Sequence, residues 1–149
     1  MAEALIIYTS LTGNTEACVD IVAAQLEEHG VEVTIEDVML AEPDDFLNYD
    51  IVLVGSYTYG VDGVLPDEME EFHEELGDLD LSGKVFGVFG SGDDFYPVFC
   101  SAVDDFEEQF EKAGAVKGGI GVKVNLYPEE EDEVLLRKLA DDIVAKSEN

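Results

Sequence analysis

A chain of 149 residues fits one domain, here taken as residues 1–149, and a composition of 46% hydrophobic and 29% charged residues excludes a largely disordered chain. The charge is extreme, because 36 acidic and 7 basic residues give a formal net charge of -29. Nucleic acid and anionic membrane surfaces are therefore poor candidate partners, since binding to phosphate needs clusters of Lys and Arg. A protein with a basic patch is favoured instead, because opposite fields steer encounter.

In the first part of the chain, short apolar runs alternate with a helical pattern. A strand is predicted at 4–8 and a helix at about 14–29. The next strand, 31–37, alternates polar and apolar residues, which predicts an edge strand with one face partly in water. A further strand, 51–57, is a nearly continuous apolar run, as expected when helices cover both faces of a sheet.

The same alternation continues to the end of the chain. A short helix follows Pro66, a strand covers 84–90, a helix covers about 99–113, a strand covers 119–124, and a last helix begins near Glu129. The apolar stripes predicted to face the core are Cys18, Ile21, Val22 and Leu26; Met69, Phe72 and Leu76; Phe99, Val103, Phe106 and Phe110; and Leu136, Leu139, Ala140 and Ile143.

Alternating strands and helices predict a parallel sheet joined by right-handed crossovers. Five strands suit a three-layer, doubly wound α/β fold with strand order 2-1-3-4-5. In such folds a ligand binds outside the carboxyl ends of the strands, where the strand order reverses. This rule selects the loops at 9–15, 57–66 and 91–99.

The first of these loops, within "YTSLTGNTE", has the composition of an anion site at a helix N-terminus. It combines short hydroxyl and amide side chains with Gly13, which allows a close backbone approach. It is neither a GKS/GKT nucleotide-hydrolase loop nor a GxGxxG fingerprint, and it contains no lysine or arginine. The alternative is an ordinary helix cap, provided by Thr12 or Asn14.

The other two loops, "SYTYGVDGVLPDE" and "SGDDFYPVF", are rich in aromatic residues, glycine and aspartate. Together with the first loop they predict a planar ring held between aromatic side chains, with a phosphate tail that reaches the helix N-terminus. The residues on which this rests are Tyr57, Tyr59, Gly60, Gly63, Gly92, Asp93, Phe95 and Tyr96.

Three segments carry a resemblance to a known family. "SLTGNTE" (10–16), "SYTYG" (56–60) and "GSGDDFYPVFCSAVDDFEEQFEKAGA" (90–115) resemble the flavin-binding segments of the flavodoxins, in the same order and with the same spacing. The similarity covers essentially the whole chain and is to the short-chain members. It implies a flavodoxin-like fold, a non-covalent FMN cofactor, and low-potential one-electron transfer between basic-patch redox proteins such as flavodoxin or ferredoxin reductases and acceptor enzymes.

The resemblance also implies a role for individual residues. Tyr96 matches the outer stacking tyrosine, and Gly60 matches the glycine whose carbonyl turns to accept the proton on flavin N5. Tyr59 stands at the inner position where many members have tryptophan, so stacking on that face is expected to be weaker. The implied phosphate-loop residues are Ser10, Leu11, Thr12, Gly13, Asn14 and Thr15, with Thr58 as a further hydroxyl. The implied ring-side residues are Ser91, Gly92, Asp93, Phe99 and Cys100.

The implied redox behaviour follows from charge. Full reduction of the ring adds negative charge to it, and both the phosphate and the surrounding carboxylates oppose that charge. The expected couple is therefore strongly reducing.

The cysteines, the histidines and the absence of targeting signals bear on redox or metal chemistry, on catalysis and on location. Cys18 and Cys100 lack metal or CxxC spacing and fall on apolar helix faces, so buried free thiols are favoured over a disulfide. His29 and His73 lie in acidic helical segments, which predicts solvated rather than catalytic side chains. No signal peptide or membrane span is evident, so we expect a soluble, cytoplasmic monomer.

Two other functions remain open on this sequence. An FMN-dependent oxidoreductase of quinone-reductase type has the same fold, although it needs room for a second substrate over the ring. A regulatory domain of response-regulator type is the third possibility, but it requires an acidic cluster after the first strand and an aspartate at the end of the third, which residues 8–12 and 55–59 do not supply.

Overall fold

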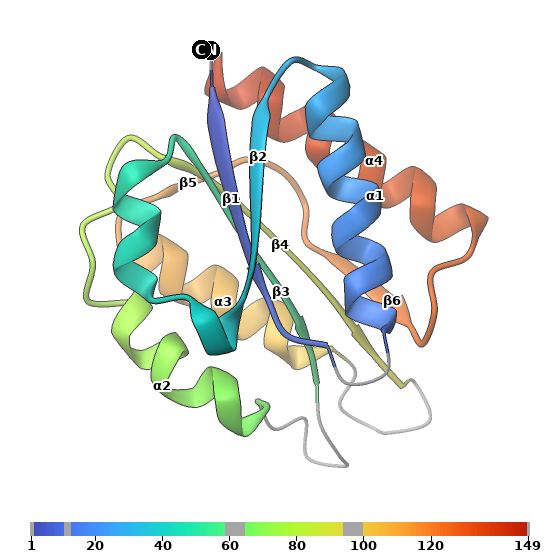
Figure 1. The fold of residues 1–149 in the computed structure, drawn as a ribbon, viewed down its shortest axis with the longest axis horizontal. Coiled ribbons are helices and arrows are strands. Elements are labelled where there is room, and N and C mark those ends of the chain that lie inside the picture. Colours follow the sequence, from blue (N-terminus) through green and yellow to red (C-terminus); the bar gives the residue numbers. More distant parts are fainter. Residues whose placement is uncertain (1, 11–12, 59–64, 94–99, 149) are drawn as a thin grey trace.

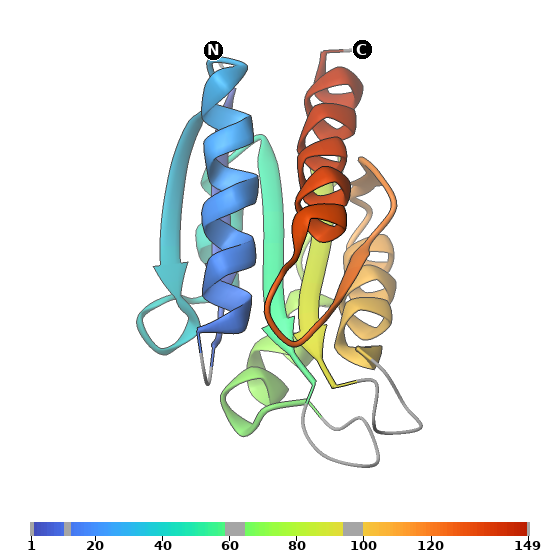
Figure 2. The same cartoon turned by 90° about the vertical axis from the view of Figure 1, so that its right-hand side faces the viewer.

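A parallel β-sheet with helices on both faces forms the centre of the molecule (Figures 1 and 2). The structure is a computed structural model of the full chain, described here for residues 2–10, 13–58, 65–93 and 100–148. Its elements in chain order are β1 (Glu3–Tyr8), α1 (Asn14–Glu28), β2 (Glu32–Asp37), η1 (Val38–Leu40), η2 (Pro43–Asn48), β3 (Ile51–Tyr57), α2 (Asp67–Leu76), β4 (Val85–Gly92), α3 (Ser101–Lys112), β5 (Val116–Lys117), β6 (Val122–Asn125) and α4 (Glu130–Ser147).

The strand order confirms the predicted doubly wound topology. The described strands form a sheet in the order β2-β1-β3-β4-β5, with β6 also paired to β4, and the pairing is parallel throughout. Strand β2 lies at one edge and is only partly buried, as its alternating sequence predicted. Strands β1 and β3 occupy the middle of the sheet, where both of their faces are covered.

The last strand differs from the prediction of one strand at 119–124. Two short strands, β5 and β6, share the fifth position, and both pair with β4. Between them the sequence Gly-Gly-Ile-Gly (118–121) belongs to neither strand. The N–H of Gly118 still donates to the Phe86 carbonyl of β4 at 2.9 Å, whereas the side chain of Ile120 is 78% exposed. A Cβ added at Gly121 would lie 2.7 Å from Cγ1 of Val103, so the chain there passes too close to α3 for a larger residue.

Each face of the sheet has its own hydrophobic core. Helices α1 and α4 cover one face, and α2 and α3 cover the other together with η1 and η2 (Figures 1 and 2). The predicted apolar stripes that lie within described residues face these cores, although Ile21 is only partly buried. Because the strands are parallel, the carboxyl ends of β1, β3 and β4 meet at one edge of the sheet, beside the N-terminus of α1.

Candidate functional site

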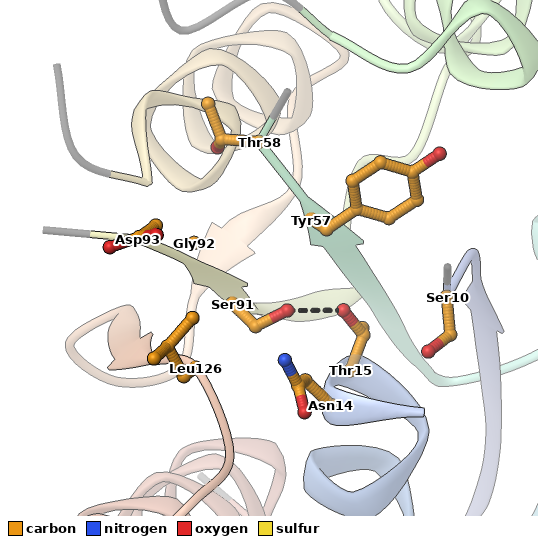
Figure 3. Close-up of a pocket in the computed structure, with 9 residues that line it drawn as sticks. All are labelled: Ser10, Asn14, Thr15, Tyr57, Thr58, Ser91, Gly92, Asp93 and Leu126. Carbon is orange, nitrogen blue, oxygen red and sulfur yellow. Dashed lines mark hydrogen bonds between the residues drawn. The ribbon is translucent and has the colours of Figure 1, made fainter. Parts of the chain in front are cut away.

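A hollow lies at this carboxyl edge, where the strand order reverses (Figure 3). It encloses about 420 Å³ of empty space, part of it open to solvent. Residues from three predicted loops meet there, together with one residue that follows β6. The described lining residues are Ser10, Asn14, Thr15, Tyr57, Thr58, Ser91, Gly92, Asp93 and Leu126.

The side chain of Ser10 organises the start of α1. Its Oγ accepts hydrogen bonds from the N–H groups of Gly13, at 3.1 Å, and Glu16, at 3.4 Å. Gly13 is the N-cap residue and has a φ of 88°, a left-handed conformation that glycine adopts without strain. Asn14 is already helical, so it is not the helix cap that we considered as an alternative. Because the lone pairs of Ser10 Oγ accept these two bonds, its hydroxyl proton remains available to donate to a ligand.

Thr58, directly after β3, is engaged in a similar way. Its Oγ1 accepts a hydrogen bond of 3.1 Å from the N–H of Ala102 in α3, and its own N–H donates to the carbonyl of Ser91 at 3.0 Å. The Thr58 hydroxyl thus lies on the rim of the hollow. Its oxygen already accepts a hydrogen bond from the protein, so its proton can be donated to a ligand.

Two buried hydroxyls form the floor of the hollow (Figure 3). The hydroxyls of Thr15 and Ser91 share a hydrogen bond of 2.7 Å, and these residues are 1% and 3% exposed. One of the two must accept in this bond, and that hydroxyl keeps a proton for a bound acceptor. The described part of the hollow therefore offers several O–H donors.

The donors are neutral. Among the described lining residues none is Lys or Arg, and α1 adds the positive end of its dipole and its first-turn N–H groups. A phosphate can bind such a set without a cation, and Tyr57, Leu126 and Gly92 line the same hollow.

The sequence model of the flavodoxins matches residues 6–137, which is most of the chain. The chain belongs to the flavodoxin family. The flavodoxin of Maridesulfovibrio salexigens is 40% identical to it over 136 residues, which cover 90% of this chain and 93% of the relative.

Solved flavodoxin structures agree with this assignment. The flavodoxin of Streptococcus pneumonia TIGR4 is 50% identical, with a TM-score of 0.94 over 97% of this chain and 99% of the other. A short-chain flavodoxin associated with a non-canonical PDU bacterial microcompartment is 40% identical, with a TM-score of 0.96 over 99% of both chains.

Membership of the family decides the broad function. Flavodoxins bind FMN and carry electrons between redox partners, and they have no substrate of their own. The quinone-reductase and response-regulator alternatives are therefore set aside. The chemistry that FMN supplies when bound is the reversible uptake of electrons by its ring.

The described residues of this flavodoxin fit the cofactor. The hollow has hydroxyl donors that suit a phosphate, at the N-terminus of a helix. Its wall is also closely supported, because a Cβ added at Gly92 would lie only 2.9 Å from Cys100 Sγ. Glycine is therefore the residue that lets β4 end directly over this thiol.

The structure brings many of the predicted site residues together, but only some of them line the hollow. Gly13 caps α1, and Cys100 is buried behind Gly92 with 1% exposure, outside the lining of the hollow. Helix α3 begins at Ser101 rather than near 99. Those that line the hollow are Ser10, Asn14, Thr15, Thr58, Ser91, Gly92 and Asp93. The predictions for Leu11, Thr12, Tyr59, Gly60, Tyr96 and Phe99 lie outside the described residues.

Sequence reasoning missed one residue that lines the hollow and one residue beside it. Leu126 lines the hollow because it follows β6, and the rule that selected the other loops would also have selected the end of the last strand. Glu68 was missed as well. Its Oε2 accepts hydrogen bonds from Thr9 Oγ1 at 2.6 Å and from the Tyr57 hydroxyl at 3.1 Å, a contact between three elements that no sequence spacing indicates.

The remaining candidates have structural contacts. Both cysteines are free and buried, as predicted. His29 pairs with Asp141 at 2.7 Å and is exposed, whereas His73 was expected to be solvated and instead packs edge-on against Phe106. Among the described residues no cluster of metal-ligating side chains is found, and no helix is long and apolar enough to cross a membrane.

Proposed function

We propose that this flavodoxin is a low-potential one-electron carrier whose FMN lies in the hollow at the ends of β1, β3 and β4. The phosphate lies at the N-terminus of α1, where Ser10, Asn14, Thr15 and Thr58 donate to it. The observation that supports this placement is the set of O–H donors in the hollow whose oxygens already accept hydrogen bonds from the protein. A hydroxyl oriented in this way cannot easily turn its lone pairs toward an anion.

The low potential follows from the charges around the hollow. No Lys or Arg is among the described lining residues, whereas the carboxylates of Asp93 and Glu68 lie at or beside it. Partial burial raises the pKa of Glu68, but hydrogen bonds from Thr9, the backbone and Tyr57 outweigh this effect and hold the pKa below its ordinary value. Glu68 is therefore ionised at neutral pH, and its charge opposes the addition of negative charge nearby.

Reconstitution and electrochemistry test this proposal. The apoprotein should bind one FMN and leave FAD unbound, because the adenylate of FAD would have to extend from an enclosed phosphate. Spectroelectrochemical titration should then show two separated one-electron waves, the lower one more negative than for free FMN. A single two-electron wave at the potential of free FMN contradicts the proposal.

The partner surface proposed here is the acidic first turn of α2, beside the hollow. Asp67 and Glu70 are exposed there, and the net charge of -29 favours a partner with a basic patch. The same self-repulsion favours a monomer, and a cytoplasmic location suits buried free thiols.

A matched pair of charge reversals tests the docking surface. The double variant Asp67→Lys/Glu70→Lys should slow electron transfer to a basic haem protein at low salt, with little effect at high salt. The control Glu27→Lys/Glu28→Lys has the same net charge but lies at the far end of α1, where both residues are exposed. Equal slowing by both variants indicates an effect of overall charge and contradicts the α2 surface.

A further inference from the structure

Leu126 has an unusual backbone conformation for its residue type. Its φ is 60°, and among the described non-glycine residues only Cys100 shares a positive φ. A leucine in the left-handed region is strained, because its Cβ crowds the following carbonyl, whereas a glycine there is not. The N–H of Leu126 donates a hydrogen bond of 2.7 Å to the carbonyl of Gly92, which ties the strained residue to the end of β4.

The strain does not serve the hydrophobic core. The side chain of Leu126 is 49% exposed, although core leucines of this chain such as Leu136 are fully buried. It lies instead in the wall of the hollow, across from Ser10 and next to Asp93 and Ser91 (Figure 3). An aliphatic side chain left half in water in a polar hollow gains free energy only when something apolar covers it.

We propose that Leu126 is an apolar contact for the FMN, held in a left-handed conformation so that its side chain faces the cofactor. This inference rests on the proposed placement of FMN in the hollow. Because Leu126 and Ser10 lie on opposite sides of the hollow, Leu126 contacts the ribityl or ring part of FMN and Ser10 the phosphate. The strain is the cost of this orientation, as is common where local backbone strain occurs at binding sites.

Two substitutions separate the side chain from the strain. Leu126→Ala removes the apolar contact but keeps a Cβ in the left-handed region, and Leu126→Gly removes both. Both variants should lose affinity for FMN and for riboflavin by the same factor of about ten, which corresponds to about 1.4 kcal/mol. In urea unfolding of the apoprotein, Leu126→Gly should have a higher midpoint than Leu126→Ala, because only glycine relieves the strain.

The matched control is Leu135→Ala, since Leu135 is 50% exposed but lies on α4 outside the lining of the hollow. It should bind both flavins like the unsubstituted protein. The proposal is overturned if Leu126→Ala binds both flavins as tightly as the unsubstituted protein does. It is also overturned if Leu126→Ala loses affinity for FMN but not for riboflavin. A midpoint of Leu126→Gly at or below that of Leu126→Ala overturns the strain argument. If the unsubstituted protein and Leu135→Ala bind neither flavin, the proposed FMN-dependent function itself is wrong.

Discussion

Replacing Glu68 by glutamine tests how the site is held together. The carboxylate joins three elements, because it belongs to α2 and accepts hydrogen bonds from Thr9, after β1, and Tyr57, at the end of β3. It therefore holds both ends of the β3–α2 connection, which contains Tyr59 and Gly60 in the sequence. Glu68→Gln removes the charge but keeps one oxygen that can still accept.

The expected loss of stability follows from these contacts. A hydrogen bond to a charged group contributes about 1.5–3 kcal/mol, and one to a neutral group about 1 kcal/mol. Both bonds end on the same oxygen, Oε2, so a glutamine carbonyl in that position can accept both of them, but as weaker neutral bonds, and the site is partly exposed to water. We therefore expect Glu68→Gln to lower the free energy of unfolding of the apoprotein by about 1–2 kcal/mol.

The effect should depend on pH in a defined direction. The pKa of Glu68 lies below its ordinary value of 4.5, since the hydrogen bonds from Thr9, the backbone and Tyr57 outweigh the opposing effect of burial. The folded state thus binds the proton less tightly than the unfolded state. The stabilisation is fully present above the ordinary pKa and is lost as the pH falls through the lowered one. The difference in free energy of unfolding between the unsubstituted protein and Glu68→Gln should therefore be largest at neutral pH and should disappear at acid pH.

Urea unfolding of both apoproteins from neutral to acid pH measures this difference. Glu70→Gln is the control, because Glu70 is exposed on the same helix and its replacement changes the net charge equally. Tyr57→Phe and the double variant Tyr57→Phe/Glu68→Gln give the coupling energy. Equal losses for Glu68→Gln and Glu70→Gln, or a difference that does not change with pH, would refute the reasoning.

Further expectations concern packing, thiols, phosphate and charge. Gly90→Ala should lower the unfolding free energy by about 2–3 kcal/mol in urea melts, because an added Cβ would lie 2.3 Å from the Ser56 carbonyl oxygen. Burial raises the pKa of both Cys18 and Cys100 to about 12, so a thiol reagent at mildly alkaline pH should react only after unfolding. Ser10→Ala should weaken FMN about tenfold in fluorescence titrations and leave riboflavin unchanged, since riboflavin has no phosphate. The urea midpoint of the apoprotein should rise from low to molar salt, because screening shortens from about 10 Å at 0.1 M to about 3 Å at 1 M, and a flat midpoint contradicts the repulsion argument.

The sequence by itself determined the class and order of the elements. The run at 51–57 became β3 with the predicted bounds, because a strand covered by helices on both faces must be apolar along its whole length. The position of the site was also determined, since the carboxyl ends of parallel strands meet at one edge whatever the side chains are. The loop at 10–15 was recognisable as a candidate phosphate site because its hydroxyl and amide side chains lie close together along the chain.

Only the tertiary structure decided how these parts are held. Glu68 meets Thr9 and Tyr57 across large separations in sequence, and such contacts leave no periodic pattern. The left-handed conformation of Leu126 is unfavourable for a leucine, so its local sequence argues against it; the bond to Gly92 holds it in place. The last strand is split into β5 and β6, and the close approach of Gly121 to Val103 of α3 is likewise a contact between residues far apart in the sequence. Local sequence encodes periodicity and propensity, whereas these features depend on which distant atoms the fold brings into contact.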